Sequence, residues 1–335
     1  MFRPRFLSVA VALVVLVAIA PAPGAPVPPK KPRPVISAAN ADKVRSVKEL
    51  EMAVWRIVPG PAKGELTFVH WEKPIEVVAD EDYRSLRKIA DGKKLIHFAA
   101  SKDGKRMAWC ENNTQVVVQE LPDGKPIAIE TKNDQPQMAF SPDGKLLATG
   151  GYGTEAKLWN IKGEAVRALD CGGEGGLWPV FSPDGKLIAV GNRNDETRIF
   201  EVATGKLLSN LPKKFTHEIA FSPDGKMLAA SYVDGTVTLW DVAKGSELYS
   251  AASGATEIFT LDWSPKGDVL VTAGLAGKIT LWNPAKLTVL KELDGPAWVI
   301  SVRFTPDGTR ILSSGGSENS GTHDRKVIVW AIPED

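Results

Sequence analysis

The chain has few of the residues that build disulfide scaffolds or metal centres. Only two of its 335 residues are cysteine and four are histidine. Cys110 and Cys171 lie far apart in the repeat pattern described below, so we expect both to be unpaired. The histidines are isolated and lack the spacing of zinc ligands. They are His70, His97, His217 and His323. We therefore expect no disulfide framework, no metal and no other cofactor.

An excess of charge of one sign is also absent. The chain has 41 basic and 40 acidic residues, which gives a formal net charge of +1. Without residues 1–25, which contain Arg3 and Arg5 and no acidic residue, the balance is 39 to 40, or −1. A balance near zero offers no electrostatic footprint for nucleic acid, so we do not expect nucleic acid as a partner.

Long hydrophobic runs are absent except at the start of the chain. Arg3 and Arg5 precede fifteen residues, Phe6 to Ala20, that carry no charge and only Ser8 as a polar side chain. A basic start and a short apolar core are typical of an export signal, and the core is short for a membrane span. Residues 1–25 are therefore expected to be either a signal peptide that is removed or an N-terminal anchor that is retained. Either one predicts export to the periplasm, the cell envelope or the extracellular space, with the membrane contacted only through this segment.

A proline-rich segment follows the apolar core. Proline accounts for seven of the fourteen residues from Pro21 to Pro34. Such a composition favours extended polyproline II structure and cannot form a core. We interpret residues 26–40 as a linker to a single folded domain over residues 41–335.

The domain is organised around a turn that recurs six times. In Ser222-Pro223-Asp224-Gly225 the proline presets φ at the second position, and the glycine can adopt positive φ at the fourth. The six turns begin at Ser101, Ser141, Ser182, Ser222, Ser264 and Thr305, at intervals of 40, 41, 40, 42 and 41 residues. The apolar runs beside the turns have the length of strands rather than helices.

A second position keeps the same period. It lies 18 residues after the start of each of the first five turns and 25 residues after the start of the last. It is occupied by Gln119, Trp159, Phe200, Trp240, Trp282 and Trp330. The last repeat therefore carries an insertion of 7 residues within residues 313–326. A period of about 40 to 45 residues with four short strands per unit is typical of a β-propeller.

The recurring turn and the recurring aromatic position 18 residues after it resemble the repeats of the WD40-repeat family over residues 95–335. The Trp-Asp pair that names the family occurs once, at Trp240-Asp241, and no Gly-His pair begins a repeat. The polar network that family members build on that histidine is therefore expected to be mostly missing, with packing holding the blades together. The resemblance implies an all-β propeller and, with the expected export segment, an exported bacterial member of the family.

The region before the first clear repeat, residues 41–91, is expected to be a degenerate blade. Strands are predicted at residues 52–58, 66–72 and 75–79, and residues 83–90 resemble the strand that precedes each later turn. This gives seven blades, six of them from residues 92–335, and the alternative is six blades with an N-terminal decoration. The last unit lacks a fourth strand of its own, so a strand near residues 44–50 is expected to close the ring, or residues 83–90 if there are six blades.

The resemblance places the partner surface on the loop face, which is formed by the loops between fourth and first strands and between second and third strands. By register this face carries large aromatic residues and arginine, the types that dominate binding energy at interfaces. They are Tyr152, Trp178, Arg193, Phe215, Tyr232 and Trp298. For Trp178 and Trp298 packing between blades is an equal alternative, whereas Arg193 and Tyr232 are expected on the surface.

Motifs that would carry catalysis are not found. Glycine-rich residues 172–176 are expected in a loop between strands rather than before a helix, which argues against a phosphate cradle. His323 and Asp324 share the long last loop with serines, where nothing fixes the geometry of a nucleophilic triad. The inner-strand positions that could face the central channel include one acid and no histidine. They are Gln137, Trp178, Glu218, Thr260 and Ser301.

Two classes of function remain. The first is a non-catalytic scaffold, expected to be a monomer, that holds a protein or peptide on the loop face. The second is an exported propeller enzyme of the lactonase or hydrolase type, with carboxylates and histidines around a metal in the channel. A glycan-binding module is a further alternative. The composition of the channel positions favours the scaffold.

Overall fold

The computed structural model describes most of the chain. The described residues are 32–60, 64–70, 74–89, 97–110, 114–121, 124–194, 196–212, 215–315 and 326–333. One compact unit runs from Arg33 to Asp335, and Met1–Pro32 is a separate unit. The expected export segment, residues 1–25, lies outside the described residues. Within the described ranges no helix is long and apolar enough to cross a membrane.

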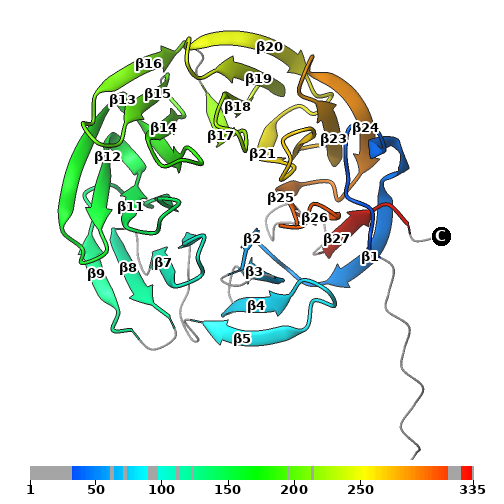
Figure 1. The fold of residues 1–335 in the computed structure, drawn as a ribbon, viewed down its shortest axis with the longest axis horizontal. Coiled ribbons are helices and arrows are strands. Elements are labelled where there is room, and N and C mark those ends of the chain that lie inside the picture. Colours follow the sequence, from blue (N-terminus) through cyan, green and yellow to red (C-terminus); the bar gives the residue numbers. More distant parts are fainter. Residues whose placement is uncertain are drawn as a thin grey trace, which may run out of the picture. The chain divides into compact units, whose positions relative to one another are not determined.

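The strands of residues 33–335 are arranged around a central axis as the blades of a β-propeller (Figure 1). In the four-stranded blades the first strand lies nearest the axis and the fourth lies on the circumference. Neighbouring strands pair antiparallel through short turns, as the spacing of the Ser-Pro-Asp-Gly turns requires. The all-β propeller predicted from the sequence is confirmed, and the helix described is one short 3-10 turn, η1 (Ala41–Lys43).

Five four-stranded sheets form separate blades within the described residues. The first two are β2 (Arg56–Pro59), β3 (Glu65–Val69), β4 (Ile75–Ala79) and β5 (Ser85–Ile89), followed by β6 (Phe98–Ala100), β7 (Arg106–Cys110), β8 (Gln115–Glu120) and β9 (Ile127–Glu130). The next two are β17 (Thr216–Phe221), β18 (Met227–Tyr232), β19 (Thr236–Asp241) and β20 (Ser246–Ala252), followed by β21 (Ile258–Trp263), β22 (Leu270–Gly274), β23 (Lys278–Asn283) and β24 (Thr288–Asp294). The fifth consists of β25 (Val299–Phe304), β26 (Arg310–Gly315), β27 (Lys326–Ala331) and β1 (Arg45–Glu51).

The expected seven separate blades are not found, because two repeats share one seven-stranded sheet. This sheet consists of β10 (Met138–Phe140), β11 (Leu146–Thr149), β12 (Gly151–Asn160), β13 (Ala165–Phe181), β14 (Leu187–Asn192), β15 (Thr197–Glu201) and β16 (Leu207–Leu211). Strand β13 has 17 residues and pairs with β12 along its first part and with β14 along its last part.

The glycines of residues 172–176 explain why β13 continues. A Cβ on Gly175 would lie 2.1 Å from Oδ1 of Asn192, so a larger residue here would displace the Asn192 side chain. Gly175 and Gly176 pair with Gly153 and Tyr152 on β12, which extends the sheet beyond its usual end. The glycine-rich segment is thus part of a strand, and its expected placement in a loop was wrong.

The ring closes as predicted for a strand near residues 44–50. Strand β1 pairs antiparallel with β27 and lies beside it in Figure 1. A further contact joins this last blade to the blade of β2 to β5, because the buried Arg310 on β26 donates a 3.0 Å hydrogen bond to the hydroxyl of Tyr83, between β4 and β5. Strand β1, from the start of the folded unit, therefore completes the last blade.

The packed unit begins earlier than the expected end of the linker at residue 40. Ile36 is fully buried in a cluster with residues of β22 to β27, and its N–H donates a 2.9 Å hydrogen bond to the carbonyl of Gly308. The side chain of Asn40 accepts a hydrogen bond from the N–H of Ser37 at 2.8 Å. Residues 35–40 therefore belong to the folded unit.

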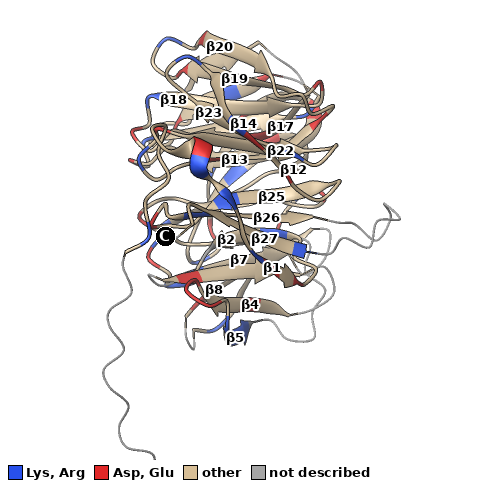
Figure 2. Cartoon of the chain, turned by 90° about the vertical axis from the view of Figure 1, so that its right-hand side faces the viewer, with Lys and Arg blue, Asp and Glu red and all other residues tan. Residues whose placement is uncertain are grey.

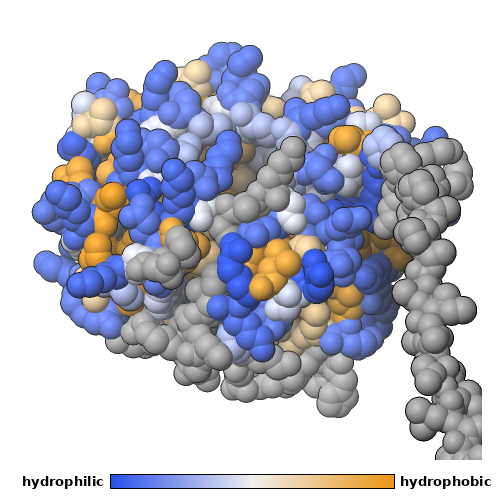
Figure 3. Space-filling model, turned by 60° about the horizontal axis from the view of Figure 1, so that its bottom comes forward, coloured by the Kyte–Doolittle hydropathy of each residue, from blue (hydrophilic) through white to orange (hydrophobic). Residues whose placement is uncertain are grey.

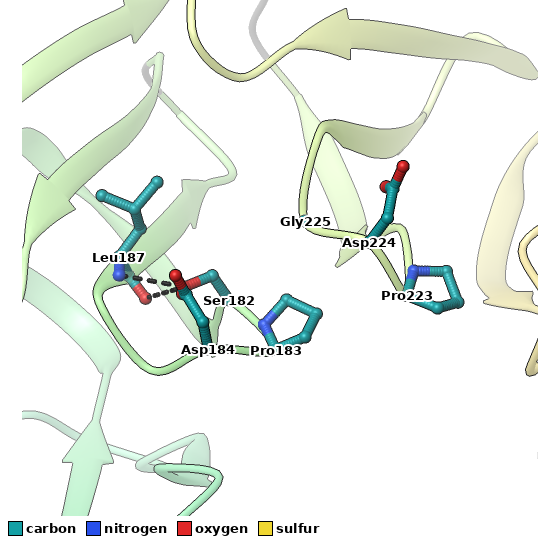
Figure 4. A pocket seen from close by; sticks show the side chains of 7 residues that line it. All are labelled: Ser182, Pro183, Asp184, Leu187, Pro223, Asp224 and Gly225. Carbon is teal, nitrogen blue, oxygen red and sulfur yellow. Dashed lines mark hydrogen bonds between the residues drawn. The ribbon is translucent and has the colours of Figure 1, made fainter.

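The recurring turns are held by the same hydrogen bonds in successive repeats. In the turn at Ser182, the serine hydroxyl donates to Oδ1 of Asp184 at 2.7 Å and accepts from the N–H of Leu187 at 2.9 Å. Gly225, in the next turn, has φ of 72°, a conformation that favours glycine. A hollow of ≈ 300 Å³ lies between these two turns (Figure 4). It is lined by Ser182, Pro183, Asp184, Leu187, Pro223, Asp224 and Gly225.

The polar network inside the blades is more complete than the sequence indicated. Three tryptophan indoles donate hydrogen bonds to hydroxyls on the neighbouring strand. The pairs are Trp159 with Thr149 at 2.8 Å, Trp282 with Thr272 at 2.9 Å, and Trp330 with Ser313 at 2.9 Å. Packing between blades acts alongside these bonds, as where Leu239 on β19 and Leu261 on β21 share one buried cluster. These Trp–hydroxyl bonds are the part of the family's network that the described residues retain, and packing holds the blades together with them.

Candidate functional site

Three of the six residues predicted for the loop face are exposed aromatics. Phe215 has 57% of its surface exposed, Tyr152 49% and Trp298 36%. Phe215 immediately precedes β17, Tyr152 lies near the start of β12, and Trp298 immediately precedes β25. Each occupies one of the two kinds of loop position that the resemblance assigns to this face.

The other three residues are less exposed. Arg193 and Trp178 are half-buried, and a Cβ added to Gly176 would lie 2.8 Å from the Trp178 ring. Tyr232 is only 1% exposed, so its expected place on the surface was wrong. Its hydroxyl accepts a 3.2 Å hydrogen bond from the indole of Trp240, which ties the side chain into the blade.

A chain of side-chain contacts extends from the exposed aromatics across three inner strands. The Trp298 and Phe259 rings lie 6.3 Å apart between centroids, and Phe259 contacts His217 edge-on at 5.1 Å. Nε2 of His217 lies 2.6 Å from Oε1 of Glu257. Trp298 and Glu257 immediately precede β25 and β21, Phe259 lies in β21, and His217 lies in β17. The contacts therefore join three blades near the starts of their first strands.

His217, Glu257 and Phe259 were not predicted from the sequence, although their distance from the recurring turn could have identified them. Glu257 stands seven residues before its turn, as Phe215 and Trp298 stand before theirs. His217 and Phe259 stand five residues before their turns. We name the set Phe215, His217, Glu257, Phe259 and Trp298 the aromatic rim.

Burial determines the charge state of His217. Burial lowers the pKa of its imidazole, and the positive charge of Arg193 acts in the same direction. The neighbouring Glu257 carboxylate opposes this lowering but does not outweigh it. At neutral pH the imidazole is therefore uncharged, and its Nε2–H donates to Glu257.

Below the rim, polar side chains cross the central channel. Arg56 on β2 reaches Oε1 of Gln137, just before β10, at 3.5 Å and Oε1 of Glu218 on β17 at 3.4 Å. The sheets that contain β10 and β17 are not the neighbours of the β2 sheet in the ring, so this side chain spans the channel. Nε2 of Gln137 lies 3.4 Å from Nε2 of His97. Gln137 and Glu218 were expected to face the channel.

A tight ion pair forms the other half of this network. Arg303 on β25 lies 2.6 Å from Oε1 of Glu218, and its guanidinium also donates to Oγ1 of Thr260 at 2.9 Å. The positive charges of Arg303 and Arg56 hold the pKa of Glu218 below its usual value despite burial. Burial raises the pKa of Asp262 to about 6, since the nearby Arg303 compensates only part of the desolvation.

The channel thus contains more charge than the sequence indicated. Arg56, His97, Asp262 and Arg303 were all missed as channel residues. In the part of the chain that the structure describes, no three residues of the His, Cys, Asp and Glu types gather to hold a metal. His323 and Asp324 lie outside the described residues. Cys110 and Cys171 are buried and form no disulfide with each other, and burial raises the pKa of Cys171 to about 12.

The rest of the surface is mixed. Basic and acidic residues lie side by side on the view in Figure 2. Exposed apolar residues occur singly or in pairs on the outer strands and form separate patches on the side shown in Figure 3. Examples are Val47, Leu86, Val166, Leu207, Leu208, Leu248, Tyr249 and Val289. Scattered residues of this kind need no functional explanation.

Family models match three segments of the chain. The model described as "WD domain, G-beta repeat" matches residues 134–160 and 287–331, and the model "Anaphase-promoting complex subunit 4 WD40 domain" matches residues 212–266. No curated protein matches the chain. WD40 propellers are generally non-catalytic and bind proteins or peptides. The matched segments contain the recurring turns of three repeats and the strands around them, and these matches support the assignment of the chain to the WD40-repeat family.

Proposed function

We propose that the protein is a non-catalytic platform that holds a protein or peptide on its loop face, at the aromatic rim and the neighbouring Tyr152 and Arg193. The observation that carries this proposal is the exposure and the backbone conformation of Phe215. Its side chain is 57% exposed, and its backbone has φ of 63°, which is unfavourable for a residue other than glycine. Neither burial nor backbone preference explains a phenylalanine here, and strained residues of this kind cluster at binding sites.

The surroundings of Phe215 support the same proposal. Aromatic residues and arginine near the centre of an interface contribute most of the binding energy. Phe215, Trp298 and Tyr152 are exposed, and the partly buried Phe259 lies beside Trp298 and contacts the partly buried His217. A partner with apolar or aromatic side chains would cover these rings. The same exposed rings would also suit a glycan, which makes glycan binding the second candidate.

We also propose that the protein acts outside the cytoplasm. The support is the basic and apolar composition of residues 1–25 and the proline-rich segment after them. Fractionation of the host tests this point, because full-length chain in the soluble cytoplasm would contradict export. The enzyme alternative rests on convergent metal ligands, for which the described residues offer no specific observation.

Affinity capture tests the platform. The wild-type chain and a Phe215→Ala, Trp298→Ala double variant are used in parallel to recover partners from the native host. We expect a partner that the wild type retains and the double variant loses, while a Leu208→Ala variant on the circumference retains it. Equal recovery by all three proteins would exclude the rim as the site, and recovery of glycans in place of protein would favour the second candidate.

A further inference from the structure

The guanidinium of Arg56 has fewer acceptors than its position requires. Arginine has five N–H donors, and groups removed from bulk water are normally hydrogen-bonded. Among the described residues Arg56 makes two side-chain hydrogen bonds, at 3.5 Å to Gln137 and at 3.4 Å to Glu218, and both are long for a charged donor. Its side chain is 28% exposed although it reaches across the channel. No side-chain nitrogen of Arg56 is both buried and without a partner, so the unused donors are accessible to solvent.

Arg303, in the same channel, has a guanidinium with several close hydrogen-bond acceptors. It donates to Glu218 at 2.6 Å, to Thr260 at 2.9 Å and to the carbonyls of Leu261 at 3.0 Å and Val302 at 2.7 Å. Its pKa is raised, mainly because Glu218 outweighs the cost of burial, whereas burial lowers the pKa of Arg56. Arg56 thus shares the Glu218 carboxylate with Arg303, which lies closer to it, at 2.6 Å against 3.4 Å.

The position of Arg56 links it to the aromatic rim. Its neighbour Glu218 directly follows His217 in β17, so the rim and the channel network meet at adjacent residues. Gln137 and His97 lie on the other side of Arg56 and carry no charge at neutral pH, since burial lowers the pKa of His97 to about 3. A ligand that enters from the rim would meet one positive group with free donors, between neutral polar side chains and a carboxylate already paired.

We propose that Arg56 binds a carboxylate, supplied by an acidic side chain or the C-terminus of the peptide held on the loop face. Two carboxylate oxygens match the two parallel N–H donors of a guanidinium. A doubly charged phosphate fits less well, because the Glu218 carboxylate already places negative charge beside the site. Only the source of the carboxylate rests on the proposed function, since the site itself can be tested without any partner.

Nuclear magnetic resonance of the arginine side chains of the full-length chain provides the test. The Nε–Hε signal of Arg56 is identified by its absence in the Arg56→Gln variant. Acetate is then titrated at constant ionic strength against sodium chloride, with acetamide as an uncharged probe of the same shape. An Arg84→Gln variant is the matched control, because the side chain of Arg84 is 73% exposed and lies away from the channel.

The expected result is a saturable shift of the Arg56 signal with acetate and none with acetamide, in the wild type and in Arg84→Gln alike. A signal that moves with phosphate and not with acetate, or one that does not move at all, would overturn the proposal. N-acetylglycine and N-acetylglutamate α-amide then separate a terminal from a side-chain carboxylate. If acetate binds while rim variants retain every captured partner, the platform proposal fails and the channel site stands.

Discussion

The indole of Trp240 donates its hydrogen bond to the hydroxyl of Tyr232 over 3.2 Å, in place of the threonine or serine that serves three other repeats. Those acceptors, Thr149, Thr272 and Ser313, stand eight residues after the first residue of their turns. The same position in the repeat of Trp240 is Ala230, which has no hydroxyl. Tyr232, two residues further along β18, supplies the missing acceptor from within the core.

Removing the Tyr232 hydroxyl should therefore lower stability. Tyr232→Phe leaves the buried indole N–H without an acceptor, which costs about 1 to 3 kcal/mol in free energy of unfolding. Denaturant unfolding measures the loss. Adding Ala230→Thr to this variant places the acceptor used in the other repeats and should restore part of the stability. A Tyr232→Phe protein as stable as the wild type would show that the hydrogen bond is not needed.

Truncation from the N-terminus should show where the folded unit begins. Deleting residues 1–32 should leave the melting temperature unchanged, because the compact unit starts at Arg33. Deleting residues 1–36 removes the fully buried Ile36 and its hydrogen bond to Gly308, a loss of about 2 to 5 kcal/mol by analogy with buried side-chain truncation.

The longest truncation tests the closure of the ring. Deleting residues 1–51 removes β1 and exposes the edge of β27, so an aggregating protein is expected. A well-behaved monomer from this truncation, measured by light scattering, would contradict the closure described above. Equal melting temperatures for the two shorter truncations would contradict the role of Ile36.

His97 should make the folded state sensitive to acid. Burial lowers its pKa to about 3, whereas the unfolded chain binds a proton near the ordinary value of 6.5. Below pH 6.5 the unfolded state therefore takes up a proton that the folded state does not, and stability falls as the pH is lowered toward 3. Asp262 acts in the opposite direction, because its raised pKa of about 6 lets the folded state hold a proton between about pH 6 and pH 4.

A comparison of variants separates these two opposing effects. Between pH 7 and pH 5 the wild type should lose about 1 to 2 kcal/mol relative to a His97→Gln variant. Denaturant unfolding at both pH values measures the difference, with the two proteins compared at each pH. Parallel pH profiles for the two proteins would show that His97 titrates normally in the folded state.

The parts of the fold that follow local rules could be predicted from the sequence. The turn at Ser222 is set by Pro223 and Gly225, and the pairing of β1 with β27 follows from the unpaired edge of the last unit. The continuity of β13 could not be predicted, because it depends on how closely Gly175 approaches Asn192 in another strand. Two repeats therefore merged into one sheet where seven separate blades were expected.

The candidate site was harder to predict for a related reason. The pairing of β17 with β18 shifts register between Thr216 and Glu218, and β21 and β25 show the same irregularity at their starts. Such a bulge redirects neighbouring side chains, so strict alternation fails there. His217 can then join the rim while Glu218 joins the channel network. Phe215 and Trp298 could be predicted because their position, seven residues before the start of the recurring turn, places them at the loop face without any knowledge of strand pairing.

The most direct test of the platform is the affinity of the captured partner for a Phe215→Ala variant. Phe215 is exposed, so the substitution should change the free energy of unfolding by less than about 0.5 kcal/mol. Binding should weaken by about 2 kcal/mol, roughly a thirtyfold rise in Kd, whereas Leu208→Ala, on β16 with 50% of the Leu208 surface exposed, should leave Kd unchanged. An unchanged Kd for Phe215→Ala, with both variants folded, would contradict the central claim that this protein binds its partner on the loop face.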